Sequence, residues 1–505
     1  MKAHQLALVV LLGAAPPLLQ APGSAPAVPS AGNGPVVLVP ANGNLQAALD
    51  AAAPGTTIRL ASGATYTGNF VLRRKTAAGV ITVRAADDVM LPPGQRVGPA
   101  SAAVMAKLQA PAGMTPILTA EDGASHYRLI GLEFAGNPTT PGATLVQLGR
   151  LDMKMAAQTP TDIVFDRVYV RGDAVGGGHR GLELNVANGQ VLNSYISGFW
   201  EVGRDSQAIA IFDGPGPLLV QNNYVEASGE NFLAGGHDPP LSDLVPSDLT
   251  IAGNYFFKPL AWQSAHRGSV KNLFELKNAR RVRIFDNVFE NCWTDAQSGH
   301  AVLFTVRNEG GAAPWSTISD VTFEYNIIKN AAGFALSVLG LDDRPGVASV
   351  QGVNLVVTNN LFVGVNGGVM IASTLRPSTF AHNTMLGIQN AFLSMPEALN
   401  HGLTFINNVV AGGPYGIAGN GKAAMGLPSL NQGAPGAVMR ANVIEGNVQR
   451  TVPYPAGNYA LPSGGLAKVL GPAHRYVGAD KSTDGLPIGA DISGLLVRIP
   501  WVTIE

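Results

Sequence analysis

The sequence predicts an all-β solenoid, a rod in which coils of short strands stack on one another. Apolar and polar residues alternate over short segments, which is typical of half-buried strands. This segment recurs eleven times between residues 132 and 442, around a pivot position, at spacings of 23 to 39 residues. The uneven spacing indicates insertions that fall in loops while the strands keep their register.

Most pivots are asparagines, and apolar residues surround them at fixed offsets. In "LTFINNVVA" around Asn408, apolar side chains stand five and three positions before the pivot and two after it. The pivots in chain order are Leu132, Val168, Ser194, Asn223, Asn254, Asn287, Asn326, Asn360, Asn383, Asn408 and Asn442. A sharp corner between strands needs a residue that tolerates a left-handed φ, and we expect the asparagine to take that conformation. The stacked amides are also expected to form a hydrogen-bonded ladder.

The N-terminus predicts export. Residues 1–27 contain Lys2, an apolar run from Leu6 to Ala15 and a small-residue pattern ending at Ala27, which together indicate a secretory signal peptide. We therefore expect a secreted or periplasmic protein. No later apolar run is long enough to predict a membrane span. Because Cys292 is the only cysteine, an internal disulfide is excluded and stability must come from the core.

Three further segments follow the signal peptide. We assign residues 28–125 to an N-terminal cap and the first coils, 126–450 to the solenoid, and 451–505 to a C-terminal cap or tail. The N-terminal cap is expected to be an amphipathic helix before Pro54-Gly55, with one apolar face made of Leu45, Ala48, Leu49 and Ala52. Such a helix would cover the open end of the rod, which every solenoid must protect.

The asparagine corner within coils of three strands, together with the capping helix, resembles the right-handed parallel β-helix of the pectin-lyase-like superfamily. The resemblance covers about residues 35–450. It implies that the strand before each corner is the second of its coil and that substrate lies along the first. The sequence lacks the paired aspartates of polygalacturonases and the arginine-bearing signature of pectate lyases. The resemblance therefore implies the fold more than the reaction.

The first strands of successive coils carry the candidate catalytic residues. Alternation places Glu183 outward on residues 181–185, Glu275 and Lys277 outward on 272–277, and Arg307 outward on 301–307, so these four side chains are expected to share one solvent face. We predict that Glu275, Lys277 and Arg307, with His237 from the adjoining loop, are catalytic. Substrate-binding roles are predicted for Glu183, Asp238, Asn308 and Glu309. The alternative is a solvated face with stacked, weak ion pairs.

The loops that return to the first strands carry a recurring tryptophan. Trp200, Trp262 and Trp293 follow their pivots by six to eight residues, and polar residues such as Asp295 and His300 come next. An aromatic wall beside a polar groove suits sugar rings, which have apolar faces and hydroxyl edges. We predict that these five residues bind substrate. The alternative is that the tryptophans pack the loops against the rod.

Composition narrows the choice of ligands. The formal net charge of −1 and the absence of a recognised module argue against nucleic acid as a partner. No His/Cys cluster has zinc spacing, and no cofactor is required by the sequence. Calcium is a possible cofactor only if Asp342, Asp343 and Glu309 converge. We expect a monomer.

Two enzyme reactions and one non-enzymatic function fit these residues. A lyase that cleaves a uronate glycan by β-elimination needs a cation for the substrate carboxylate and a base for the C5 proton, and Arg307, Lys277 and His237 could supply them. A glycoside hydrolase needs two carboxyl groups, for which Glu275 could pair with Glu183, Glu309, Asp238 or Asp295. The third possibility is a rod that binds carbohydrate, or serves as a surface structure, without catalysis. We favour the polysaccharide-cleaving enzyme, with β-elimination as its reaction.

Overall fold

The computed structural model describes residues 34–111, 116–137, 142–396, 399–419, 425–446, 452–466 and 481–502. The predicted signal peptide, residues 1–27, lies outside these residues. The described residues belong to one compact unit that extends from Ala31 to Glu505. Within them, no helix combines the length and the apolar character that crossing a membrane requires.

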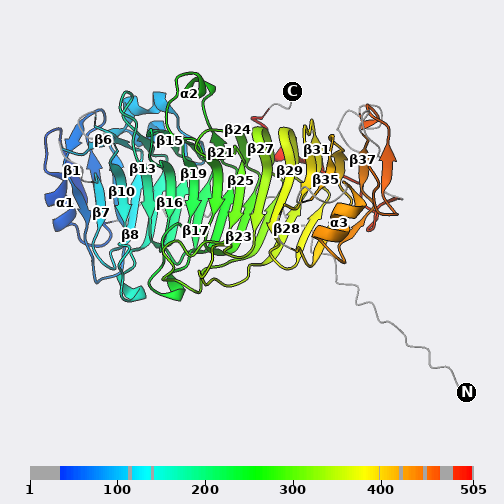
Figure 1. The fold of residues 1–505 in the computed structure, drawn as a ribbon. Coiled ribbons are helices and arrows are strands. Elements are labelled where there is room, and N and C mark those ends of the chain that lie inside the picture. The colour runs from blue at the N-terminus through cyan, green and yellow to red at the C-terminus, as the bar shows by residue number, and fades with distance from the viewer. Residues whose placement is uncertain are drawn as a thin grey trace, which may run out of the picture. The chain divides into compact units, whose positions relative to one another are not determined.

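The described chain is a parallel β-helix made of three rows of strands (Figure 1). The pre-corner sheet holds the strands that precede the predicted pivots, paired in parallel from coil to coil. Eleven of its fourteen described strands, β8 to β36, precede the eleven pivots, and three more lie before them. Its strands are β1 (Val36–Val39), β2 (Thr57–Leu60), β5 (Ile81–Ala85), β8 (Ser125–Ile130), β11 (Thr161–Asp166), β14 (Ala187–Leu192), β17 (Leu218–Gln221), β20 (Ser247–Ala252), β23 (Ala279–Phe285), β26 (Ile318–Glu324), β28 (Val353–Thr358), β30 (Ser378–Ala381), β33 (Leu403–Ile406) and β36 (Val438–Arg440).

The other two rows belong to one sheet, because two long strands, β27 and β29, run through both. The post-corner row contains β3 (Thr65–Thr67), β6 (Ala106–Gln109), β9 (Leu132–Ala135), β12 (Tyr169–Arg171), β15 (Tyr195–Phe199), β18 (Tyr224–Ala227), β21 (Tyr255–Phe257), β24 (Val288–Cys292), β27 (Ile327–Leu339), β29 (Leu361–Ser373), β31 (Thr384–Leu386), β34 (Val409–Ala411), β37 (Val443–Glu445) and β38 (Tyr459–Leu461). The first-strand row contains β4 (Phe70–Leu72), β7 (Leu118–Ala120), β10 (Thr144–Leu148), β13 (Arg180–Leu184), β16 (Gln207–Ile211), β19 (Glu230–Ala234), β22 (Asn272–Leu276), β25 (Val302–Thr305), then β27 and β29, β32 (Ala391–Ser394) and β35 (Gly416–Ala418). The predicted all-β parallel β-helix is therefore confirmed.

The core lies between the rows and repeats from coil to coil. In-register pairing places like side chains on like, as with Val282 beside Val321. The rings of Phe256 and Phe289 stack at 4.9 Å, and those of Phe232 and Phe274 at 4.8 Å. Each coil thus covers the apolar face of the next, which is why the offsets around the pivots repeat in the sequence.

The predicted asparagine ladder is present, and it runs through fully buried amides. The Nδ2 group of each asparagine donates to Oδ1 of the next, at 2.9 to 3.1 Å over the steps from Asn223 to Asn442. A ninth asparagine, Asn458, extends the ladder beyond the last predicted pivot. Each Oδ1 also accepts the backbone N–H of the preceding ladder asparagine.

The conformation expected of these asparagines is wrong by one position. The left-handed φ belongs to the residue before each pivot: Asp286 has φ 57°, Tyr325 53° and Ala441 55°. The pivot asparagine faces inward, where its amide satisfies the backbone groups that the corner removes from the sheet. The corner thus needs asparagine for its hydrogen bonds, while the strained neighbour can be of several residue types.

Helices and the C-terminal segment complete the unit. The predicted cap is α1 (Leu45–Ala51), which is capped by the Asn44 side chain and buries Leu45 and Leu49. The other helices are short: α2 (Leu260–Ser264), α3 (Leu427–Gly433), α5 (Ile492–Arg498) and the 3₁₀ turns Asp88–Met90, Pro99–Val104, Ala156–Gln158 and Ser242–Leu244.

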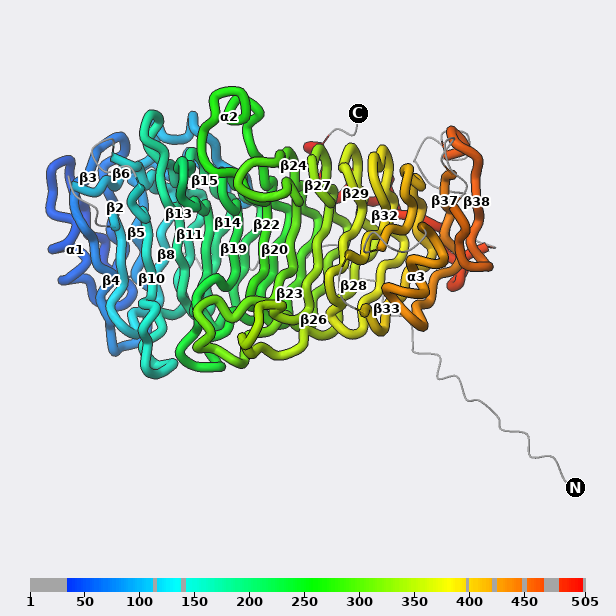
Figure 2. Tube along the Cα trace, in the orientation of Figure 1, coloured from blue at the N-terminus to red at the C-terminus, as the bar shows by residue number. Residues whose placement is uncertain are grey.

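The last described residues, 481–502, form a return segment that lies along the post-corner row (Figure 2). Asp484 bonds His382 at 2.8 Å, and Leu495 packs with Val288, Ile327 and Leu361. Near its end, the Trp501 ring lies 5.3 Å from that of Tyr255. The segment therefore touches coils that are far apart along the stack.

Candidate active site

The first-strand row divides the predicted site residues between the two ends of its strands. The connections that lead into these strands contain Trp200, Trp293, Asp295 and His300 in loops and Trp262 in α2. His237, Asp238, Lys277, Arg307, Asn308 and Glu309 lie just after the strands end, and Glu183 and Glu275 lie within β13 and β22. The predicted residues thus form two groups rather than one.

The expected exposure of Glu183 and Glu275 is wrong. Their neighbours in sequence face the core as predicted, yet only 1% of Glu183 and 2% of Glu275 is accessible. Between them in the stack stand Ala210 and Leu233, which form a small apolar cluster with Phe212 and Leu151 outside the main core. Polar side chains surround the two carboxylates: Gln147 and Arg180 bond Glu183, and Asn272 bonds Glu275.

The register also separates these two carboxylates. Glu183 pairs with Ala210, Ala210 with Leu233, and Leu233 with Glu275, so three strand spacings lie between them. At about 4.8 Å for each spacing, the separation of their Cα atoms is roughly 14 Å. Glycosidases place their carboxyl groups closer, at about 5 to 9.5 Å. The structure thus disfavours Glu183 as the partner of Glu275 in a hydrolase.

Glu275 instead belongs to a buried polar network. It accepts a hydrogen bond from Asn272 at 3.0 Å, and burial raises its pKa. On the adjacent strand, the buried Glu230 receives Gln207 Nε2 at 2.7 Å and lies 3.3 Å from the ammonium group of Lys271. Charged groups and side-chain amides thus alternate in this network, which lies near the N-terminal ends of the first strands.

At the other end of the strands, Lys277 lies between carboxylates. Its ammonium group is 3.2 Å from Glu309, and although burial alone would lower its pKa, the charges of Glu275 and Glu309 raise it. Lys277 is therefore a firm cation at neutral pH. The aliphatic part of its side chain lies against Gly236, the neighbour of His237 in sequence.

Arg307 is engaged by two aspartates. It bonds Asp342 at 3.1 Å and Asp343 at 2.5 Å, and Arg344 also bonds Asp342, at 2.7 Å. The two carboxylates considered for calcium therefore bind guanidinium groups, and Glu309 pairs with Lys277 instead. Among the described residues, no group of three or more metal-binding side chains forms. The residues that are present thus do not fit a calcium ion.

His237 forms a pair that the sequence reasoning missed. Its Nδ1 lies 3.1 Å from Oδ1 of Asp213, a fully buried residue of the loop after β16. The hydrogen bond to Asp213 raises the pKa of His237, while burial raises that of Asp213. The His237 side chain is 36% exposed. A buried carboxylate that orients a half-exposed imidazole is an arrangement typical of general bases.

Two of the predicted binding residues shape the neighbouring loop. Asp238 accepts the backbone N–H groups of Gly310 and Ala312, at 3.0 and 2.7 Å. Asn308 is fully buried, and its amide bonds Ala348 O and Ala313 N. These contacts favour a structural role for Asn308, because its side chain offers no accessible atom to a substrate.

The three tryptophans pack together more than they line an open face. Trp262 and Trp293 are each 7% exposed and form a cluster with Val270, against which Trp200 is partly buried. The Arg267 guanidinium covers Trp200 at 5.4 Å from the ring centre. This arrangement supports loop packing for Trp262, whereas Trp293 also lines a cavity.

The polar residues beside these tryptophans are engaged with the backbone. Asp295 accepts the N–H of Val270 at 3.2 Å, and His300 Nδ1 accepts that of Phe334 at 2.9 Å. Burial lowers the pKa of His300 and keeps the ring neutral. Asp295 and His300 therefore do not form an acid–base pair with each other, since each is bonded to a backbone N–H group.

Comparison with known proteins gives likenesses of fold. No protein-family model matches the chain, and no curated protein matches it. An alginate lyase from Paenibacillus sp. str. FPU-7 aligns with 16% identity and a TM-score of 0.34, over 65% of this chain and 94% of the lyase. The pectate lyase Pel9A aligns with 14% identity and a TM-score of 0.33, over 76% and 77%. The Streptococcus pneumoniae surface protein and adhesin PfbA aligns with 11% identity and a TM-score of 0.38, over 83% and 94%.

Proposed function

We propose that this chain cleaves a uronate-containing polysaccharide by β-elimination, at the C-terminal ends of the first strands. The observation that carries the proposal is the pairing of half-exposed His237 with buried Asp213; the side chain of the cationic Lys277 lies against Gly236, which precedes His237. We also propose export, on the strength of residues 1–27, so that the enzyme meets its polymer outside the cytoplasm.

His237 is the base in this proposal. Because Nδ1 bonds Asp213, Nε2 is the ring nitrogen that faces the substrate and accepts the C5 proton of the uronate. The electron pair of that C–H bond forms the C4–C5 double bond, and the C4–O bond of the glycosidic linkage breaks. The departing oxygen takes up a proton from solvent water and becomes a hydroxyl group, and the imidazolium ion of His237 later returns its proton to solvent. Asp213 acts as a positioning residue that fixes the tautomer and stabilises the imidazolium ion.

Lys277 is the cation that receives the substrate carboxylate. A proton next to a carboxylate is removed more easily when a positive charge neutralises that group, because the carbanion-like transition state spreads charge onto it. In the structure Lys277 pairs with Glu309, whose side chain is 42% exposed. The uronate carboxylate can displace Glu309 from Lys277. Arg307 is held by Asp342 and Asp343, so it contributes to the shape and field of the site instead.

A glycoside hydrolase is the second candidate, and the raised pKa of Glu275 favours it. A carboxyl group that keeps its proton can act as a general acid toward a leaving glycosidic oxygen. Since only 2% of Glu275 is accessible, this mechanism requires the side chains around it to move aside. A rod that binds carbohydrate without cleaving it is the outcome if neither site is active.

A polysaccharide panel with matched variants tests the proposal. Uronate and neutral polymers are incubated with the protein, and products are followed by ultraviolet absorbance of the unsaturated end and by reducing ends. We expect both signals on a uronate polymer, loss of both in His237→Gln, and retention in His401→Gln, a control at an exposed histidine. Reducing ends alone, abolished by Glu275→Gln, would show a hydrolase. Full lyase activity in His237→Gln would refute the assignment of the base.

A further inference from the structure

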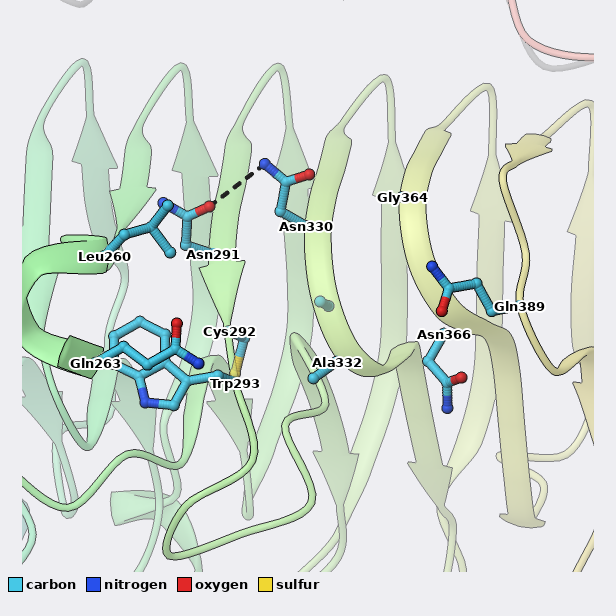
Figure 3. A pocket seen from close by; sticks show the side chains of 11 residues that line it. Leu260, Gln263, Asn291, Cys292, Trp293, Asn330, Ala332, Gly364, Asn366 and Gln389 are labelled. Atoms are coloured by element: carbon cyan, nitrogen blue, oxygen red, sulfur yellow. Dashed lines mark hydrogen bonds between the residues drawn. The ribbon is translucent and has the colours of Figure 1, made fainter. Parts of the chain in front are cut away.

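A second candidate binding site lies at the other end of the first strands. A cavity of about 430 Å³ opens where the post-corner row turns into the first-strand row, over coils β24, β27 and β29 (Figure 3). We call it the amide pocket, after the five amide side chains among its lining residues: Gln263, Asn291, Asn330, Asn366 and Gln389. Its volume falls within the range of small-ligand sites.

The lining is polar and carries no formal charge. The other six of the eleven lining residues are Leu260, Cys292, Trp293, two alanines and a glycine. In Figure 3, Gln263 and Trp293 lie at one end, Asn291 and Asn330 in the middle, and Asn366 and Gln389 at the other. Each amide offers both a donor and an acceptor, which matches the hydroxyl groups of sugars and disfavours an ion.

Two of the five amides have a structural explanation. Asn291 and Asn330 hold left-handed corners, with φ of 66° and 59°, at the level where the next coils use Gly364 and Gly387. Asn291 donates to Lys258 O at 3.1 Å and accepts a long bond from Asn330 at 3.4 Å. The corner geometry therefore accounts for these asparagines without a ligand.

The other three amides have no such explanation. Gln263 comes from α2, Asn366 from β29 and Gln389 from the loop after β31, so three separate segments bring them to one cavity. Within the part of the chain that the structure describes, their side chains have no hydrogen-bond partner in the protein. Gln263 lies beside Trp293 at one end of the cavity, and Asn366 and Gln389 lie at the other end (Figure 3).

We infer that the amide pocket binds a neutral, hydroxyl-rich saccharide unit. Amides bond the hydroxyl groups, and Trp293 with Leu260 offers apolar contact to a sugar face. This site is separate from the proposed cleavage site, since His237 and Lys277 lie beyond the opposite ends of the strands. The inference stands on the pocket alone and does not depend on β-elimination.

Direct binding measurements test the pocket. Saturation-transfer NMR and calorimetry are run with neutral gluco-, xylo-, manno- and fructo-oligosaccharides, and with uronate oligosaccharides as the charged counterpart. We expect at least one neutral oligosaccharide to bind, and Asn366→Ala combined with Gln389→Ala to weaken it about tenfold, through loss of two hydrogen-bonding groups. Gln432→Ala, at an exposed glutamine of α3, is the matched control and should keep the affinity.

Three results would overturn the inference. They are the absence of binding by every neutral oligosaccharide, an affinity that the double variant leaves unchanged, and uronate oligosaccharides that compete for the same pocket with equal affinity. The readout is binding of a saccharide that the protein need not cleave. A failure here therefore leaves the proposed β-elimination standing, and a failure of His237→Gln to abolish cleavage leaves the pocket standing.

Discussion

Replacing Asn287 by alanine tests how much the asparagine ladder stabilises the coils. The side chain is fully buried, and its Oδ1 accepts two bonds from Asn254, at 2.9 Å from the backbone N–H and 3.0 Å from Nδ2. Its Nδ2 donates to Ile251 O, Phe285 O and Asn326 Oδ1, at 2.9 to 3.0 Å. Alanine would remove all of these bonds without letting water in.

The magnitude follows from the groups left behind. The backbone N–H of Asn254 loses its acceptor inside the protein, and a buried donor without a partner costs about 1 to 3 kcal/mol. The lost bonds to Ile251 O and Asn326 add roughly 1 kcal/mol. We therefore expect Asn287→Ala to lower the free energy of unfolding by about 2 to 4 kcal/mol.

Guanidinium unfolding followed by far-UV circular dichroism measures this change. Asn431→Ala, at an exposed position of α3, is the control and should change the free energy of unfolding by less than about 0.5 kcal/mol. If Asn287→Ala unfolds with the same midpoint as the control, the ladder does not stabilise the corner and the reasoning is refuted.

Three further predictions concern the site and its surroundings. The rate of uronate cleavage should rise with pH through the raised pKa of His237. Asp213→Asn should move this rise to lower pH, because the carboxylate that stabilises the imidazolium ion is gone. A pH profile of kcat/KM that does not move contradicts the pairing. Because the pKa of Glu275 is raised, the folded state holds its proton more tightly than the unfolded state. The resulting stability is present at low pH and is lost as pH rises through the folded pKa. In unfolding measured across pH, Glu275→Gln should therefore flatten the dependence of the free energy of unfolding on pH. Trp262→Ala should lower the free energy of unfolding by roughly 3 to 5 kcal/mol, while glycan binding per folded molecule persists. Trp293→Ala should lower both the free energy of unfolding and the glycan affinity. Weaker binding by an equally stable Trp262→Ala protein would show that Trp262 touches the glycan.

The fold could be predicted from the sequence because every coil requires the same kinds of side chain at the same positions. Each coil needs apolar residues at the same offsets and an inward amide at the corner, so positions such as Val282 and Asn287 recur. The backbone conformation of the corner left no comparable trace. Asp286, Tyr325 and Ala441 share a left-handed φ but no chemistry, and the pattern therefore pointed to the asparagine beside them.

The site could be predicted only in part, because contacts between neighbouring coils decide which side chains are exposed. Alternation correctly turned Glu275 away from the core but gave no sign that neighbouring side chains such as Asn272 bury it. Asp213 escaped notice because it meets His237 through two loops on neighbouring coils, whose paths no periodicity encodes. One signal was available, since both residues follow first strands that stack directly on each other.

The return segment of residues 481–502 changes how this stack can come apart. In a solenoid without such a segment, each coil contacts only the coils next to it, so the stack can unfold from an end one coil at a time. Here Asp484 is tied to His382, Arg498 lies 3.4 Å from Asp286, and Trp501 packs on Tyr255. Unfolding of one of these coils also breaks its contacts with the return segment, and the other coils then lose part of their support from that segment. We therefore expect coils that are far apart in sequence to unfold together.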